Sequence, residues 1–188
     1  MLSLLAVSDG NNIYLVRTLN TSFNCFSISA LETDTFLVST FDHPQPIRAI
    51  TVQGQEGDLQ NANFPSTVYT LEGNKSTYIT STKTAIISDR NDDAIYMCSI
   101  ENGHMKKIKD LAIREPRGVV GGPDGSVFVC CHGTHSVVRL SPRGDVLINY
   151  DVRMKGPYAI SVSRDGTSLV VSNNPLKNGK IKLFTIMG

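Results

Sequence analysis

The sequence predicts an all-β fold, namely a partial or incomplete β-propeller of four to five blades. A short apolar strand that ends in a small residue and then a polar one occurs five times, and a polar turn and a second strand follow each copy. With the strands that fit between these pairs, each unit holds about four strands in roughly 42 residues, the size of one propeller blade. Fifteen glycines, eight prolines and no tryptophan agree with a fold that has many turns.

The five copies are spaced by 31, 49, 42 and 42 residues along the chain. They are Val7-Ser8-Asp9, Val38-Ser39-Thr40, Ile87-Ser88-Asp89, Val129-Cys130-Cys131 and Val171-Ser172-Asn173. The second strands that follow them begin at Ile13, Ile47, Ile95, Val137 and Ile181. This spacing divides the chain into predicted blade units of approximately 1–22, 23–62, 63–112, 113–154 and 155–188.

Each type of strand has the residue pattern that its place in a blade requires. Inner strands are covered on both faces by neighbouring blades, so they are continuous apolar runs such as Val127–Cys131. Outer strands face solvent on one side and alternate, as Lys180–Leu183 does. Asp124-Gly125 and Asp165-Gly166 stand where a tight antiparallel turn needs a left-handed residue.

The segment His104–Glu115 carries two conflicting signals. Met105, Ile108, Leu111 and Ala112 have the spacing of an amphipathic helix. The register of the repeats places an outer strand here instead. We follow the register and predict a strand.

Composition excludes several classes of protein. The 18 basic and 17 acidic side chains nearly cancel, which argues against a chain that binds polyanions over its whole surface. The longest apolar runs are far too short to span a bilayer, so we expect no membrane segment. Four cysteines, two of them adjacent, are too few for a disulfide scaffold, and Met1–Val7 is a poor signal peptide. These features favour a reduced, cytoplasmic protein.

One segment of the fourth unit resembles a known repeat. Asp124–Val137 is similar to the NHL repeat, a pattern of the type D-G-x-I-Y-V-x-D-x-x-N-H-R-I, and Ile87–Ile95 matches the second half of that pattern at the same spacing. The chain departs from it at Cys131, Thr134 and Ser136, where the repeat has Asp, Asn and Arg. The chain is similar to the divergent NHL propellers at the C-termini of tripartite-motif (TRIM) ubiquitin ligases.

The resemblance implies a non-enzymatic recognition module that binds a protein substrate or single-stranded RNA on one face. In such ligases a RING domain performs catalysis, and this sequence has no RING or B-box cysteine–histidine array. Any ubiquitin-ligase activity would therefore lie outside this chain.

Cys130-Cys131-His132-x-x-His135 is the strongest metal-like pattern. Adjacent strand residues point to opposite faces, so the two thiols cannot easily share one ion. We expect Cys130 to fill a core position and Cys131 to replace a turn aspartate. We predict no metal, no cofactor and no catalytic residue.

The alternative is a metal-dependent propeller hydrolase of the sugar-lactone lactonase type. Such an enzyme needs several convergent carboxylates at the matching strand ends. Those positions hold Asp9, Thr40, Asp89, Cys131 and Asn173 here, so only two of five are carboxylates. An aspartate at such a position can instead cap the following turn.

The predicted binding surface is the propeller face where the loops after the inner strands and the linkers between blades meet. Positive charge is concentrated in the second half of the chain: residues 1–80 hold three basic and seven acidic side chains, and residues 81–188 hold fifteen and ten. Cations beside an aromatic ring suit a phosphate backbone with stacked bases. The predicted binding residues are Arg90, Arg114, Arg117, His132, His135, Lys155, Tyr158 and Lys177.

Four to five blades are fewer than the six that NHL propellers usually have, so we expect either that upstream blades lie outside this sequence or that the chain closes unusually. An open propeller would expose two apolar blade faces that need cover. Met1–Val7 could complete the last sheet within one chain. Alternatively, two chains could join as a homodimer through their open blade faces, and we favour the homodimer because a net charge of +1 does little to keep copies apart.

Overall fold

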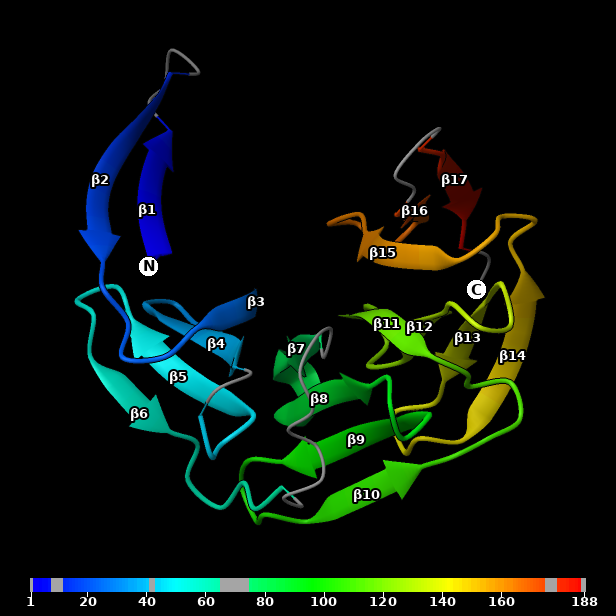
Figure 1. Cartoon of the computed structure of the whole chain (residues 1–188), viewed down its shortest axis with the longest axis horizontal. Coiled ribbons are helices and arrows are strands. Elements are labelled where there is room, and N and C mark those ends of the chain that lie inside the picture. The colour runs from blue at the N-terminus through cyan, green and yellow to red at the C-terminus, as the bar shows by residue number, and fades with distance from the viewer. Residues whose placement is uncertain (1, 8–11, 41–42, 65–74, 175–178, 187–188) are drawn as a thin grey trace.

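Five antiparallel sheets stand around a common axis in the computed structural model, which describes residues 2–7, 12–40, 43–64, 75–174 and 179–186 (Figure 1). Four of them are propeller blades, so the prediction of an incomplete all-β propeller of four to five blades is confirmed. The remaining sheet is a two-stranded hairpin at the N-terminal side. No helix of the described residues is long and apolar enough to cross a membrane.

The strands of each sheet follow one another along the chain. The hairpin consists of β1 (Leu2–Val7) and β2 (Ile13–Leu19). Blade 1 consists of β3 (Cys25–Glu32), β4 (Thr35–Thr40), β5 (Ile47–Thr51) and β6 (Glu56–Asp58). Blade 2 consists of β7 (Ser76–Ile79), β8 (Thr84–Asp89), β9 (Ala94–Ser99) and β10 (Met105–Ile108), with a short 3-10 turn, Thr80–Thr82, after β7. Blade 3 consists of β11 (Pro116–Gly121), β12 (Val127–Cys131), β13 (Ser136–Leu140) and β14 (Val146–Asp151). Blade 4 consists of β15 (Pro157–Val162), β16 (Ser168–Asn173) and β17 (Ile181–Thr185).

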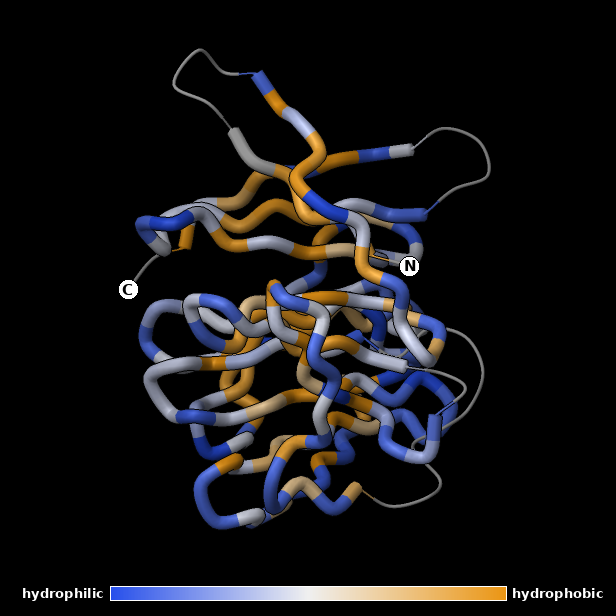
Figure 2. The backbone as a smooth tube through the Cα atoms, turned by 90° about the vertical axis from the view of Figure 1, so that its left-hand side faces the viewer, coloured by the Kyte–Doolittle hydropathy of each residue, from blue (hydrophilic) through white to orange (hydrophobic). Residues whose placement is uncertain are grey.

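The blades pack face to face, and this explains the unbroken apolar runs. All residues of β8 and β12 are buried. Ile87 contributes to the apolar cluster between blades 1 and 2, whereas its neighbour Ile86 contributes to the cluster between blades 2 and 3. Figure 2 shows hydrophobic stretches in the middle of the strands and hydrophilic ones at the turns on the rims.

The conflict over residues 104–115 is resolved in favour of the repeat register. Met105–Ile108 form β10, which pairs antiparallel with β9. Residues 109–115 form turns and a connection rather than a helix. The pairing with β9 supplies the backbone hydrogen bonds that a helix would otherwise provide, so tertiary context overrides local periodicity.

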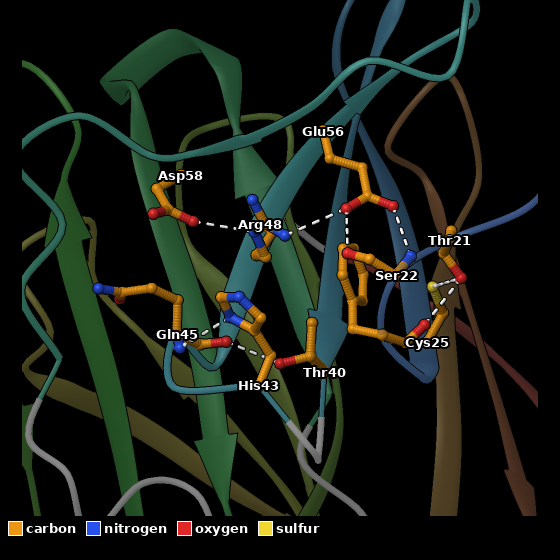
Figure 3. A network of polar contacts seen from close by, with 10 residues as sticks. Thr21, Ser22, Cys25, Thr40, His43, Gln45, Arg48, Glu56 and Asp58 are labelled. Carbon is orange, nitrogen blue, oxygen red and sulfur yellow. Dashed lines mark hydrogen bonds and ion pairs between the residues drawn. The ribbon is translucent and has the colours of Figure 1, made fainter.

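The linker between the hairpin and blade 1 is held by a polar network (Figure 3). The backbone N–H and the side-chain hydroxyl of Ser22 both donate to the Glu56 carboxylate. Arg48 forms ion pairs with Glu56 at 3.2 Å and with Asp58 at 2.8 Å, and its guanidinium lies 5.0 Å from the centre of the Phe23 ring. The base of the hairpin is therefore tied to blade 1.

Glu56 is charged in this network. Burial opposes ionisation of its carboxyl, but the hydrogen bonds from Ser22 and the charge of Arg48 outweigh that effect and lower the pKa of Glu56. Leu19 and Phe23 pack beside this network against Val38 and Ile50.

The two ends of the propeller do not meet. Figure 1 shows the hairpin and blade 4 on opposite sides of an opening. Within the described ranges, β1 pairs only with β2, and β17 pairs only with β16. Closure within one chain, with Met1–Val7 completing the last sheet, is therefore not the arrangement of this structure.

Gly118 lets blades 3 and 4 approach closely. A Cβ atom at this position would lie 2.7 Å from the Tyr158 carbonyl oxygen and 3.0 Å from the Ala159 Cα, and both are backbone atoms that cannot swing away. Gly118 therefore has a packing role between these two blades.

We predict that Gly118→Ala lowers the free energy of unfolding by about 1–3 kcal/mol, the usual cost of overpacking. Urea denaturation followed by circular dichroism measures this value. The control is Gly57→Ala, because a Cβ there meets nothing within 4 Å. We expect that variant to stay within about 0.5 kcal/mol of the wild type. Equal effects of the two variants would contradict the close-approach argument.

Candidate functional site

The inner strands of the four blades line the channel of the propeller. Ser27, Lys75, Gly118 and Ala159 lie at one level of this channel, and the residue after each of them also lines it, around a cavity of about 260 Å³. Three of these four positions carry Ser, Gly or Ala. Lys75 is the exception, so one long cationic side chain occupies space that three small residues leave open.

Lys75 lines this cavity, and its ammonium group lies near two aromatic rings. Its Nζ lies 5.1 Å from the centre of the Phe26 ring of blade 1 and 5.6 Å from the centre of the Tyr158 ring of blade 4. The guanidinium of Arg117, from blade 3, lies 5.3 Å from the same Tyr158 ring. These contacts therefore bring together one residue from each of the four blades, next to the cavity. We call these four residues, Phe26, Lys75, Arg117 and Tyr158, the channel cluster.

The charge of Arg117 acts on Lys75. Partial burial and the nearby charge of Arg117 lower the pKa of Lys75. Lys75 forms no ion pair with a carboxylate of the described residues, and its contacts are with ring faces. An anion that enters the channel would relieve the repulsion between the two cations.

Ser88 positions the backbones that carry the two cations. It is fully buried at the end of β8. The Lys75 N–H donates to the Ser88 hydroxyl at 3.1 Å, and that hydroxyl donates to the Arg117 carbonyl at 2.7 Å. One buried hydroxyl therefore links the backbones of blades 2 and 3 at the two residues that carry the cations.

Three of the predicted binding residues lie beside acidic side chains, so their polar groups are already engaged within the loop face. Arg114 forms an ion pair with Asp93 at 2.9 Å. Arg90 lies 3.8 Å from the Glu115 carboxylate, and Nδ1 of His132 lies 3.1 Å from the same group. These pairs reduce the positive potential of the loop face away from the axis.

The other predicted binding residues do not lie together. Nδ1 of His135 accepts a hydrogen bond from the Gly156 N–H at 3.2 Å, so the ring connects the loop after β12 to the linker before β15. Lys155 is exposed in that linker. Lys177 lies outside the described residues. Of the predicted set, the structure brings Arg117 and Tyr158 together beside Lys75.

Sequence reasoning missed Lys75 and Phe26. The signal that could have found Lys75 is the register of the inner strands, because the matching positions in the other blades are Ser27, Gly118 and Ala159. Without a strand assigned at 76–79, Lys75 has no register and is one surface lysine among many. Phe26 precedes a channel position in the same way as Tyr158 does.

The cysteine–histidine pattern does not form a shared site. Cys130 lies in the apolar cluster between blades 3 and 4, and Cys131 lies in the cluster between blades 2 and 3. The two side chains therefore point to opposite faces, as predicted. Burial raises the pKa of Cys131 to about 12 and also raises that of Cys130, so both thiols stay protonated at neutral pH.

At the strand-end positions that a lactonase would use, the described polar side chains form hydrogen bonds within the loops that follow them. Asp89 is buried, and its Oδ1 accepts hydrogen bonds from the N–H groups of Asn91 and Asp92 at 3.1 and 3.2 Å. This confirms the turn-capping interpretation for Asp89. Thr40 donates to the Gln45 carbonyl, and Asn173 accepts from the Lys180 N–H. Asp9 lies outside the described residues, and the described ranges contain no group of three His, Cys, Asp or Glu side chains placed to hold a metal.

Comparison with solved structures shows similarity to other β-propellers. Hydrazine synthase from Kuenenia stuttgartiensis has 15% sequence identity and a TM-score of 0.67, with 90% of this chain and 48% of that chain covered. A Bacteroides uniformis protein named as a candidate 6-phosphogluconolactonase has 17% identity and a TM-score of 0.67, with coverage of 98% and 60%. Virginiamycin B lyase from Staphylococcus aureus has 16% identity and a TM-score of 0.60, with coverage of 89% and 57%.

These similarities establish the fold alone, because the identities are low. The chain spans about half to three-fifths of the length of these structures. No family model matches the sequence, and no curated protein sequence is significantly similar to it. The NHL and TRIM resemblance therefore remains a hypothesis from the repeat pattern.

We predict that the acidic side chains of the loop face make stability dependent on pH. Two hydrogen bonds lower the pKa of Asp92 to about 2. The one from Lys107 has the larger effect, and the one from Lys109 adds to it. A carboxyl whose pKa is lower in the folded chain stabilises it above its unfolded pKa, and this contribution disappears as pH falls through the folded value.

Asp92→Asn should therefore be less stable than the wild type at pH 6 by up to about 1 kcal/mol, because such exposed pairs contribute little. The difference should shrink as the pH falls from about 4 towards 2. Urea unfolding of both proteins across this range measures it. A difference that does not change with pH would show that Asp92 acts through hydrogen bonding rather than charge.

Proposed function

We propose that this chain is a non-enzymatic recognition module that binds single-stranded RNA, with the channel cluster as the centre of its site. The observation that carries this proposal is the convergence of Lys75, Arg117 and two aromatic rings at the axis. Cations attract the phosphate backbone, and ring faces stack with bases without demanding a sequence. A protein substrate with an acidic segment is the second candidate, since the cations would attract its carboxylates too.

The wider role rests on the NHL resemblance. In a TRIM-like ubiquitin ligase, the propeller would select the substrate and a RING domain outside this chain would perform catalysis. The pairing of the outer cations with acids supports a site confined to the channel. On this view the loop face contributes shape and hydrogen bonds, and the channel cluster contributes charge. We also propose a cytoplasmic location, because four cysteines, two of them adjacent, suit a reducing compartment better than a disulfide-bonded protein.

We predict that Lys75→Ala weakens binding to a fluorescein-labelled 12-nucleotide RNA of random sequence by at least about tenfold, because one charged contact contributes about 1.5–3 kcal/mol, and 1.4 kcal/mol is a factor of ten. Fluorescence anisotropy at several salt concentrations measures this. The slope of log K against log salt should decrease by about 0.7, the value for one lost phosphate contact on a single strand.

Lys83→Ala is the matched control. Lys83 is an exposed lysine at the turn after β7, at the other end of that strand from Lys75, and its partner is Glu101. Its substitution should leave the affinity unchanged. If wild type binds no RNA but binds an acidic peptide through Lys75, the ligand class is protein. Equal loss for both lysines would contradict the channel site.

We predict that the aromatic ring at position 158 matters more than its hydroxyl. Tyr158→Phe keeps the face that Lys75 and Arg117 contact, so its RNA affinity should stay within about twofold of the wild type. Tyr158→Leu removes the ring and should lower affinity by about 1–3 kcal/mol. Thermal melting of both variants shows whether the channel remains folded. Equal RNA affinities of the two variants would show that base stacking on the ring at position 158 does not contribute to binding.

A further inference from the structure

The cavity next to the channel cluster combines positive charge with a lining that holds no acidic group. Among the described residues that line it, none is an aspartate or a glutamate. The Lys75 Nζ and the Arg117 guanidinium lie 5.6 and 5.3 Å from the centre of the same Tyr158 ring, so two cations lie close together beside the cavity. A ligand with two negative charges would balance them.

The number of charges on the ligand distinguishes two kinds of phosphate. A phosphodiester inside a nucleic-acid strand carries one negative charge. A phosphate monoester, which ends a strand, carries about 1.5 to 2 at pH 7. Burial and the charge of Arg117 lower the pKa of Lys75, so the cation pair is unfavourable without an anion. The monoester matches the two cations more closely than the diester does.

A chain of serine hydroxyls ends at the same cavity. The Ser39 Oγ lies 2.7 Å from the Ser27 Oγ, and the Ser27 Oγ lies 3.2 Å from the Ser76 Oγ. Ser27 and Ser76 both line the cavity. When Ser39 donates to Ser27 and Ser27 donates to Ser76, the Ser76 proton is left for an acceptor in the cavity. A phosphate monoester offers three acceptor oxygens to this hydroxyl and the two cations.

The size of the cavity suits the end of a strand. Its volume is about 260 Å³. Pockets that enclose a whole drug-sized ligand measure about 300–1,000 Å³, so this cavity holds one phosphate with part of one nucleotide and not a run of nucleotides. The rings of Phe26 and Tyr158, on either of which a base can stack, lie beside the Lys75 ammonium group.

We infer that the channel cluster binds a phosphate monoester, the group that is found at the end of an RNA strand and on a free nucleotide. Lys75 and Arg117 would hold the phosphate, and the Ser76 hydroxyl would donate to one of its oxygens. This inference rests on the proposed function, because it places the end of the bound strand at the channel cluster. It adds that a terminal phosphate, rather than an internal one, occupies the cavity.

Fluorescence anisotropy with three 12-nucleotide RNAs of the same sequence tests the inference. One RNA carries a 5′-phosphate, one carries a 3′-phosphate and one has hydroxyls at both ends, and each has fluorescein on an internal base. We expect at least one phosphorylated RNA to bind at least about tenfold more tightly than the hydroxyl RNA, because an added contact between charged groups changes affinity by this factor or more. Equal affinities of the three RNAs would overturn the inference and leave the proposed RNA binding in place.

Variants test which side chains produce the preference. Lys75→Ala and Arg117→Gln should each reduce the affinity ratio between the preferred phosphorylated RNA and the hydroxyl RNA to below about threefold, since each removes one cation. The ratio compares two RNAs on the same protein, so a loss of folded protein does not change it. Lys83→Ala, whose lysine is paired with Glu101, is the control and should keep the ratio of the wild type. A ratio that neither cation variant changes would overturn the inference.

Competition distinguishes the end of an RNA strand from a free nucleotide. Uridine 5′-monophosphate should displace the phosphorylated RNA from the wild type, whereas uridine, which lacks the phosphate, should not. Binding of uridine 5′-monophosphate through Lys75 without binding of any RNA would support the phosphate-monoester site and overturn the proposed RNA function. Binding of neither would overturn both.

Discussion

Face-to-face packing of the blades is the constraint on which the rest of this structure depends. The central strands β8 and β12 are buried on both faces, and residues that alternate along them belong to different interblade clusters. A single blade could not bury both of its faces. Stability therefore accumulates from one interface to the next, as in other repeat proteins.

The same constraint produces the channel cluster. Close approach of blades 3 and 4 requires a glycine at position 118, because a Cβ there would meet the backbone of Tyr158 and Ala159. Small residues leave space at the axis, and Lys75 fills it with a charge between two rings. Ser88 hydrogen-bonds to the backbone of both Lys75 and Arg117. A packing requirement thus creates a place where charge and aromatic surface can meet a ligand.

Where blade packing stops, the structure shows what an uncovered blade looks like. The residues that are buried between blades 2, 3 and 4 have exposed counterparts on the last sheet. The hairpin is anchored at its base by Leu19, Phe23 and the Glu56 network, while the rest of β2 is exposed. These exposed apolar side chains show how much of each blade is normally covered by its neighbour.

The sequence by itself determined the repeat, the strand order and the turn positions, because these depend on local pattern: apolar runs such as Val127–Cys131 and turns such as Asp124-Gly125. It also determined that Cys130 and Cys131 face opposite ways, since strand geometry alone requires it. Only the tertiary structure decided which charges remain for a ligand. Arg114 is paired with Asp93, 21 residues away, whereas Lys75 meets Tyr158 across the channel, 83 residues away. Pairing over such distances depends on how the blades are placed around the axis, and no local pattern encodes that placement.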